Sequence, residues 1–346
     1  MSAIEHDRGP LPLATRRPQG LSRMLLPIIR HEEVLLFALF LLVAGFFAVA
    51  VPSARTGGTY LDLLRDVSPN LIAAIGVTLL LLSGQFDLSV GSMLAFTGVV
   101  TVWTFNATDS MWAGIVAGLL TGPLVGAING LLVTAQGMNS LMTTLGMMFA
   151  LRGLVYVGTN KTPVVDANGF TAFTNLYQGE VLGVPVPGLI AVVLIALALV
   201  LLTRTEFGRN IYAIGGNATA ARVSGIRVQR DTFLLFVLSG TTAAIAGVLV
   251  ASQTGTGYFD AGVQGFELIV IASAVLGGVS LAGGQGSLLS AMIGVLILGM
   301  TGKGLRLMNV HTTQQLVVTG IVMLVAVYLH GVRNRLLVES RRRERA

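Results

Sequence analysis

The sequence contains no cysteine and little charge. Without cysteine, the 346 residues can form no disulfide, no cysteine-ligated metal site and no thiol nucleophile. Charged residues make up only 11% of the chain, whereas a soluble domain carries about 25%. Hydrophobic residues reach 53%, and the mean hydropathy is +0.80. These values exclude an ordinary soluble protein and indicate a chain that lies mostly within a bilayer.

Residue patterns typical of catalytic and metal sites are also missing. The four histidines, His6, His31, His311 and His330, have no metal-ligand spacing, and no Ser-His-Asp or paired-carboxylate arrangement can be assembled. The Gly302-Lys303 dipeptide lacks both the following Ser or Thr and the glycine five positions earlier that a phosphate-binding loop requires. We therefore expect no metal, no cofactor bound by this chain and no enzymatic activity of its own.

Long apolar runs dominate what is present. About 20 helical residues cross a bilayer core, and lipid requires such segments to be helices because unpaired backbone groups are costly there. The sequence predicts an all-α membrane protein of about ten transmembrane helices, with a cytoplasmic tail over 1–33, a membrane domain over 34–331 and a basic cytoplasmic tail over 332–346. The predicted spans are 34–52, 70–83, 90–105, 111–135, 141–158, 186–203, 232–252, 266–282, 287–301 and 315–331, with a short interfacial helix within 53–69.

The basic residues indicate the orientation. Of the 22 Lys and Arg, five lie in 1–33, five in 204–231 and six in 333–345. Basic segments stay in the cytoplasm, so both termini and the 204–231 loop are predicted to be cytoplasmic. The net charge of +6 then reflects membrane topology, and no nucleic-acid partner is expected.

Glycine interrupts two pairs of predicted spans, near 84–90 and near 283–287. Short, glycine-interrupted segments are typical of broken helices that line a transport pathway, although close helix packing through small residues is an alternative. The candidate pathway residues at and around these junctions are Gln85, Asp87, Ser89, Asn129, Glu267, Gln285 and Ser287.

Two carboxylates in this set have competing interpretations. An ionisable group within a membrane is a functional candidate. For Asp87 we favour a structural role at the cytoplasmic rim, as a cap on the helix that begins near Val90. Glu267 is expected in the first turn of its helix, where the dipole favours a carboxylate. Asn129 is expected to form an interhelical hydrogen bond.

The 204–231 loop has a pattern of its own. Gly215-Gly216 predicts a turn, Asn217 an N-cap, 218–224 a short helix and Gly225 its left-handed end. Such a helix cannot bury much surface alone, so we expect it to dock on a cytoplasmic partner; a solvated basic loop is the alternative. The candidate docking residues are Arg209, Gly215, Gly216, Asn217, Ala220, Ala221, Arg222, Ser224 and Gly225.

Four stretches together resemble one family. They are Asn70 to Thr78 with Phe86 to Ser92, Asn129 to Val133 with Thr144 to Gly153, Phe207 to Ile226, and Val275 to Ser287. The chain resembles the permease subunits of bacterial monosaccharide ABC importers, of the ribose, xylose, arabinose and galactose type, a family that includes autoinducer-2 permeases.

The resemblance implies an ABC importer permease fold in the bacterial inner membrane, surrounded by membrane lipid. It implies that the 204–231 loop couples to an ABC ATP-binding subunit, which holds ATP and Mg²⁺. It also implies a periplasmic or lipid-anchored solute-binding protein and a second permease subunit, either a copy of this chain or a paralogue.

The sequence departs from the family where the helices break. Gly84-Gln85-Phe86 replaces the usual Gly-Gly-Ile. Ile269, in Glu267-Leu268-Ile269, stands where the family commonly has Asp. These departures leave the solute open. The alternative function is an ion-coupled secondary transporter of a small polar solute, which would need deep carboxylates, and only Asp87 and Glu267 are available. A membrane enzyme is a third possibility, for which the sequence shows no catalytic arrangement.

Overall fold

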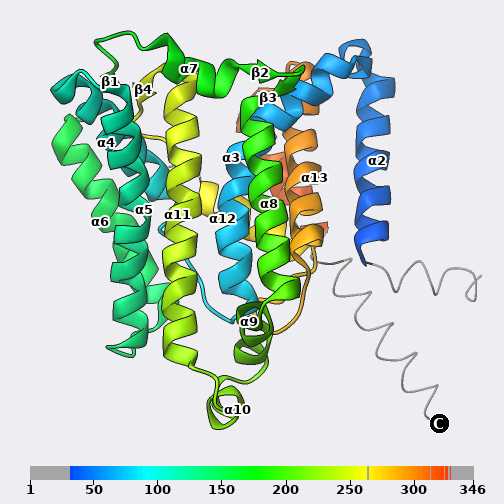
Figure 1. The fold of residues 1–346 in the computed structure, drawn as a ribbon. Coiled ribbons are helices and arrows are strands. Elements are labelled where there is room, and N and C mark those ends of the chain that lie inside the picture. The colour runs from blue at the N-terminus through cyan, green and yellow to red at the C-terminus, as the bar shows by residue number, and fades with distance from the viewer. Residues whose placement is uncertain (1–31, 263–264, 312, 323, 326–327, 329–346) are drawn as a thin grey trace, which may run out of the picture.

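The computed structural model describes residues 32–328, except 263, 264, 312, 323, 326 and 327. Residues 1–31 and 329–346 lie outside the described residues, and with them nearly all of the predicted tail over 1–33 and the whole predicted tail over 332–346. The described part is a bundle of roughly parallel and antiparallel helices (Figure 1). Eight of its helices are long and apolar enough to cross a membrane, and two shorter apolar helices cover 266–276 and 313–322. The expectation of an all-α membrane protein with about ten apolar helices is confirmed.

The long helices are α2 (Glu32–Ala50), α3 (Gly57–Leu82), α4 (Val90–Thr108), α5 (Met111–Thr134), α6 (Ser140–Thr159), α8 (Val186–Arg204), α11 (Val228–Thr254) and α13 (Leu288–Leu307). The shorter ones are η1 (Pro52–Arg55), α7 (Thr171–Gln178), α9 (Glu206–Gly216), α10 (Ala218–Val223) and α12 (Phe266–Leu276). Two small antiparallel pairs join β1 (Val164–Val165) to β4 (Thr256–Gly257), and β2 (Glu180–Val181) to β3 (Val184–Pro185). Helix α7 lies at one end of the bundle and α10 at the other (Figure 1); we call these the α7 end and the α10 end.

Burial separates core helices from peripheral ones. Most residues of α3, α4, α11 and α13 are buried, whereas most residues of α2, α6 and α8 are partly or fully exposed. The exposed residues of α2, α6 and α8 are largely Leu, Val and Phe, as expected for surfaces that face lipid. Because α3 packs against α8, α11, α12 and α13, it forms the centre of the bundle.

Glycine allows α5 to approach its neighbours closely. Helix α5 carries glycine at every fourth position from Gly114 to Gly130, which places one glycine per turn on one face. A Cβ at Gly122 would meet the carbonyl of Gly240 on α11, and a Cβ at Gly118 would meet Thr101 on α4. These close backbone contacts replace the hydrophobic driving force that lipid does not supply.

The structure corrects two predicted segments. The expected interfacial helix within 53–69 and the span at 70–83 are one continuous helix, α3, with Pro69 inside it. The predicted span 266–282 is only the eleven-residue α12, and 277–287 is irregular. The two errors have opposite sense: a new helix is predicted after Pro69 where α3 continues, and a helix is predicted to continue through Gly277 where α12 ends. Tertiary packing decides each case.

Candidate functional site

The two glycine-interrupted junctions meet at the α10 end, beside α9. The N–H of Gly284 donates to the carbonyl of Leu82, the last residue of α3, at 2.8 Å. A Cβ at Gly215 of α9 would meet that same carbonyl and the Gly284 nitrogen. A Cβ at Gly283 would meet Gly84 and Gly215. We call this contact of the 82–84, 215–216 and 283–284 backbones the glycine junction.

The glycine junction needs glycine for two reasons. Gly84, Gly283 and Gly284 have φ of 76°, 87° and 72°, a left-handed conformation in which a side chain is strained. At Gly215 the backbone conformation is ordinary, but the contact leaves no room for a Cβ. A further bond supports the junction, because the Tyr212 hydroxyl donates to the Gly286 carbonyl at 3.2 Å. Helix α9 is thereby fixed to both interrupted segments.

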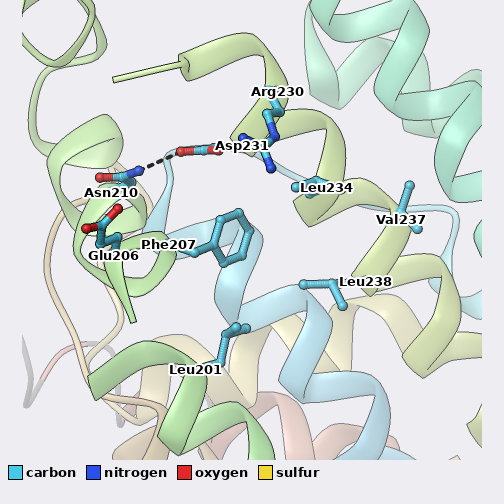
Figure 2. A pocket seen from close by; sticks show the side chains of 9 residues that line it. All are labelled: Leu201, Glu206, Phe207, Asn210, Arg230, Asp231, Leu234, Val237 and Leu238. Carbon is cyan, nitrogen blue, oxygen red and sulfur yellow. Dashed lines mark hydrogen bonds between the residues drawn. The ribbon is translucent and has the colours of Figure 1, made fainter. Parts of the chain in front are cut away.

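A second tie joins α9 to α11. The side-chain amide of Asn210 donates to Asp231 Oδ2 at 2.8 Å, and Asp231 is buried. This pair lies at the polar end of a cavity of about 480 Å³ between α8, α9 and α11, with Leu201 and Leu238 at its apolar end (Figure 2). Breaking the pair would leave a buried carboxylate short of a donor, so it holds α9 against α11 more firmly than a surface contact would.

A buried polar network surrounds the first turn of α4. Asp87 is only 2% exposed. Its Oδ1 accepts the N–H and the hydroxyl of Ser89 at 2.9 and 2.6 Å, and its Oδ2 accepts the Ser239 hydroxyl of α11 at 2.7 Å. The Asn129 amide of α5 donates to the Ser89 hydroxyl oxygen at 3.1 Å. The network thus links the 83–89 segment to α5 and α11.

Glu267 lies against the same turn from the other side. A Cβ at Gly91 of α4 would meet its Oε2. Glu267 is 7% exposed, and its Oε2 has no hydrogen-bond partner among the described residues. Asn129 Oδ1 and the Ser92 hydroxyl are likewise buried and unpartnered there. The first turn of α4 therefore gathers several polar groups with unused hydrogen-bonding capacity, which is unusual within a protein interior.

Comparison with known proteins gives one consistent family. The family model described as "Branched-chain amino acid transport system / permease component" matches residues 59–327. The chain belongs to this permease family. It is 38% identical over 300 residues to the ribose import permease protein RbsC of Escherichia coli strain K12, covering 86% of this chain and 92% of the relative. It is 39% identical over 299 residues to the L-arabinose transport system permease protein AraH of the same strain, covering 86% and 89%. No solved structure matches.

In this permease, the predicted docking residues divide into two groups. Gly215 and Gly216 are the last residues of α9, so the predicted turn there is wrong. Asn217 begins α10 by accepting the Ala220 N–H at 3.0 Å, and Gly225 follows with φ of 88°, both as predicted. Ala221 is buried, whereas the remaining candidates are exposed on the α9–α10 surface: Arg209, Ala220, Arg222, Ser224 and Gly225. One group therefore faces the bundle and the other faces outward.

The predicted pathway residues also separate. Asp87, Ser89, Asn129 and Glu267 meet around the first turn of α4, and the interhelical bond expected of Asn129 is confirmed. The expected cap on α4 is wrong for Asp87. Its Oδ1 accepts the N–H of Ser89, which precedes α4, and the side chain is buried in the bundle, where the Ser239 hydroxyl meets its Oδ2. Gln85, Gln285 and Ser287 are placed elsewhere: Gln85 and Gln285 lie beside the glycine junction, and the Ser287 hydroxyl donates to Glu33 of α2 at 2.9 Å.

Several residues of this site escaped the sequence reading. Ser239 and Asp231 lie in α11 and Asn210 lies in α9, all away from the two predicted junctions, and their partners are distant in the chain. Residues 206–216, which fall in the predicted loop, form helix α9. Its signal was available, since Thr205 is an N-cap whose hydroxyl accepts the Gly208 N–H at 3.2 Å, and Phe207, Ile211 and Ile214 recur at helical spacing.

Proposed function

We propose that this permease is the membrane subunit of an ATP-driven importer for a monosaccharide or a related small polar solute. The observation that carries the proposal is the glycine junction, which joins an outward-facing helical element, α9–α10, to both interrupted segments of the bundle. The names of the relatives, which specify ribose and L-arabinose, support a sugar as the solute. ATP and Mg²⁺ would be bound on a separate ATP-binding subunit.

The surface of α10 supports docking on that subunit. Helix α10 projects beyond the ends of the long helices (Figure 1). Val223 at its end is 86% exposed, and Arg222 and Ser224 beside it are exposed as well. An exposed apolar side chain flanked by polar ones is typical of a contact surface. In the proposed complex, the ATP-binding subunit takes this surface, and closure of its nucleotide sites moves α9 and α10.

Two routes would carry that movement into the bundle. The first is the glycine junction, where Gly215 contacts the end of α3 and the 283–284 segment. The second is the Asn210–Asp231 pair, which ties α9 to α11, and α11 carries Ser239 of the Asp87 network. We propose that the polar groups around the first turn of α4 line the solute pathway and are rearranged through these routes.

The proposed complex has further parts. A periplasmic or lipid-anchored solute-binding protein would deliver the solute at the α7 end, and a second permease subunit, identical or paralogous, would complete the pathway. The chain would lie in the bacterial inner membrane with both termini and the α10 end in the cytoplasm, as the distribution of Lys and Arg supports.

Uptake into proteoliposomes tests the function. The permease is reconstituted with its ATP-binding subunit, and uptake of D-ribose, L-arabinose and L-isoleucine is measured. ATP is supplied inside the vesicles, outside them or not at all, and each condition is repeated with and without the solute-binding protein. We expect sugar uptake that requires ATP at the face of the ATP-binding subunit. Uptake that follows an H⁺ or Na⁺ gradient without that subunit would instead establish a secondary transporter. Uptake of L-isoleucine but of neither sugar would refute the proposal that the solute is a sugar.

The natural absence of cysteine allows a direct test of orientation. Leu182, in the β2–β3 turn at the α7 end, is fully exposed, and Val223 is exposed at the α10 end. Leu182→Cys should react with a membrane-impermeant thiol reagent on intact cells after removal of the outer membrane. In cells that lack the ATP-binding subunit, which would otherwise cover the α10 surface, Val223→Cys should react only after the inner membrane is opened. The opposite pattern would reverse the proposed topology.

A further inference from the structure

A second cavity lies at the α7 end, away from the Asp87 network. Its volume is about 420 Å³, within the roughly 300–1,000 Å³ range of small-molecule pockets. Its lining comes from six elements: Asp66, Pro69 and Asn70 of α3, Leu94 of α4, Tyr177 of α7, Val250 and Gln253 of α11, Phe266 of α12, Arg306 of α13, and Gly262. All four core helices therefore contribute to one cavity.

The polar groups of this cavity are short of partners. Neither the side-chain amide of Asn70 nor that of Gln253 forms a hydrogen bond with the described residues, although both line the cavity. Tyr177 is only 5% exposed, and its hydroxyl also forms no hydrogen bond with them. The Tyr177 hydroxyl is not enclosed by the described residues and opens into the cavity, so a hydroxyl group of a ligand can replace water as its hydrogen-bond partner.

The charges at the cavity are fixed rather than mobile. Asp66 Oδ2 accepts Lys303 Nζ at 3.1 Å and Arg306 Nη2 at 3.3 Å. Burial, with a smaller contribution from Asp66, raises the pKa of Tyr177 to about 12. The phenol therefore stays protonated at physiological pH and remains a hydrogen-bond donor. Asp66 offsets one of the two positive charges of Lys303 and Arg306, and the excess charge lies next to the 52% exposed side chain of Arg306, where solvent screens it. The remaining polar groups of the lining are uncharged amides and a phenol, which suit a neutral polar ligand.

We propose that this cavity is a binding site for a neutral polyol such as a pentose, occupied before the solute reaches the Asp87 network. The amides of Asn70 and Gln253 can each donate and accept, and the Tyr177 hydroxyl can do both, which matches hydroxyl groups that also donate and accept. Phe266 and Val250 give the apolar wall on which C–H faces of a sugar can pack. The proposal rests on the proposed sugar transport.

The cavity is also well placed for onward movement. Leu94 lines it and lies one helical turn from Val90, where α4 begins beside the Asp87 network. Gly262, also in the lining, approaches Gly91 so closely that a Cβ on it would meet the Gly91 carbonyl. Glu267, next to Phe266 of the lining, lies against Gly91 too. The cavity and the central network are thus separated by about one turn of α4.

Protection from thiol modification tests the site without requiring transport. In the cysteine-free chain, purified with its ATP-binding subunit in nanodiscs, Asn70→Cys and Gln253→Cys are treated with a methanethiosulfonate reagent. We expect D-ribose or L-arabinose to slow modification about tenfold when the sugar is present at ten times its dissociation constant, because protection equals 1 + [L]/Kd. L-isoleucine, which lacks hydroxyls, should give no protection.

Asn175→Cys is the matched control. Asn175 lies on α7 with Tyr177 but is exposed and outside the cavity lining, so sugar should leave its modification rate unchanged. Equal rates with and without sugar at positions 70 and 253 would overturn the cavity site, as would equal protection at position 175 or by L-isoleucine. If Asn70→Cys does not fold, Gln253→Cys carries the test. Sugar uptake by the unmodified complex, measured separately, distinguishes failure of the cavity from failure of the proposed function.

Discussion

Replacing Gly215 by alanine should break the link between the docking helices and the bundle. The new Cβ would overlap the Leu82 carbonyl and the Gly284 nitrogen, which are themselves hydrogen-bonded at 2.8 Å. Overpacking costs about 1–3 kcal/mol and a lost backbone hydrogen bond about 0.5–1.5 kcal/mol, so the substitution should cost about 1.5–4.5 kcal/mol. If even ~1.4 kcal/mol of this strain opposes the docked arrangement, its population falls about tenfold.

Two measurements follow the effect of Gly215→Ala. Unfolding of the purified permease in mixed micelles should show the loss of stability, and ATP hydrolysis stimulated by the loaded solute-binding protein should fall while basal hydrolysis remains. Gly216→Ala is the matched control for stability, since a Cβ there meets nothing within 4 Å. Gly146→Ala on α6, where a Cβ also meets nothing within 4 Å, is the control for activity. Stability and stimulation equal to those of the controls would refute the role of the glycine junction.

Other substitutions probe the remaining ties. Asn210→Leu removes the donor to buried Asp231, so the free energy of unfolding should fall by about 1–3 kcal/mol and stimulated ATP hydrolysis should weaken. Unchanged values would show that the Asn210–Asp231 hydrogen bond neither stabilises the permease nor contributes to coupling. Asp87→Ala leaves the Ser89 and Ser239 hydroxyls without their acceptor, so the free energy of unfolding should fall by about 2–5 kcal/mol and sugar uptake should be lost. Ser239→Ala removes only one of the three hydrogen bonds to Asp87 and should lower the free energy of unfolding by less. Equal costs for the two would contradict the central place of Asp87.

The membrane architecture could be predicted from the sequence because lipid leaves few choices. A run of about 20 apolar residues must be a helix, so α2, α5, α6 and α8 were found within a few residues of their observed ends. Local chemistry was also readable where it depends on neighbours in the chain, as for the Asn217 cap and the left-handed Gly225. These features need no knowledge of distant contacts.

The meeting of distant segments could not be predicted. Gly84, Gly215 and Gly283 each signalled irregular backbone, but nothing local states that they touch one another. The Tyr177 hydroxyl likewise becomes informative only once α7 packs against α11, which brings it to the same cavity as Asn70 and Gln253. The continuation of α3 through Pro69 could not be predicted for the same reason, because a proline inside a helix is tolerated when packing supports the surrounding turns.

Helix α3 extends from the cavity at the α7 end to the glycine junction at the α10 end, so a tilt of this helix changes both places at once. From Asn70, in the proposed sugar cavity, to Leu82, in the glycine junction, α3 runs without interruption for about 18 Å at 1.5 Å per residue. Pro69 lacks the N–H that would bond to the Arg65 carbonyl, which makes the helix most compliant just beyond the cavity. A tilt of about 10° around the midpoint of this rod moves its ends in opposite directions by roughly 1.6 Å each. In the proposed importer, a movement of α9 at one face of the membrane would therefore change the width of the proposed sugar cavity toward the other face, through the backbone of α3 alone.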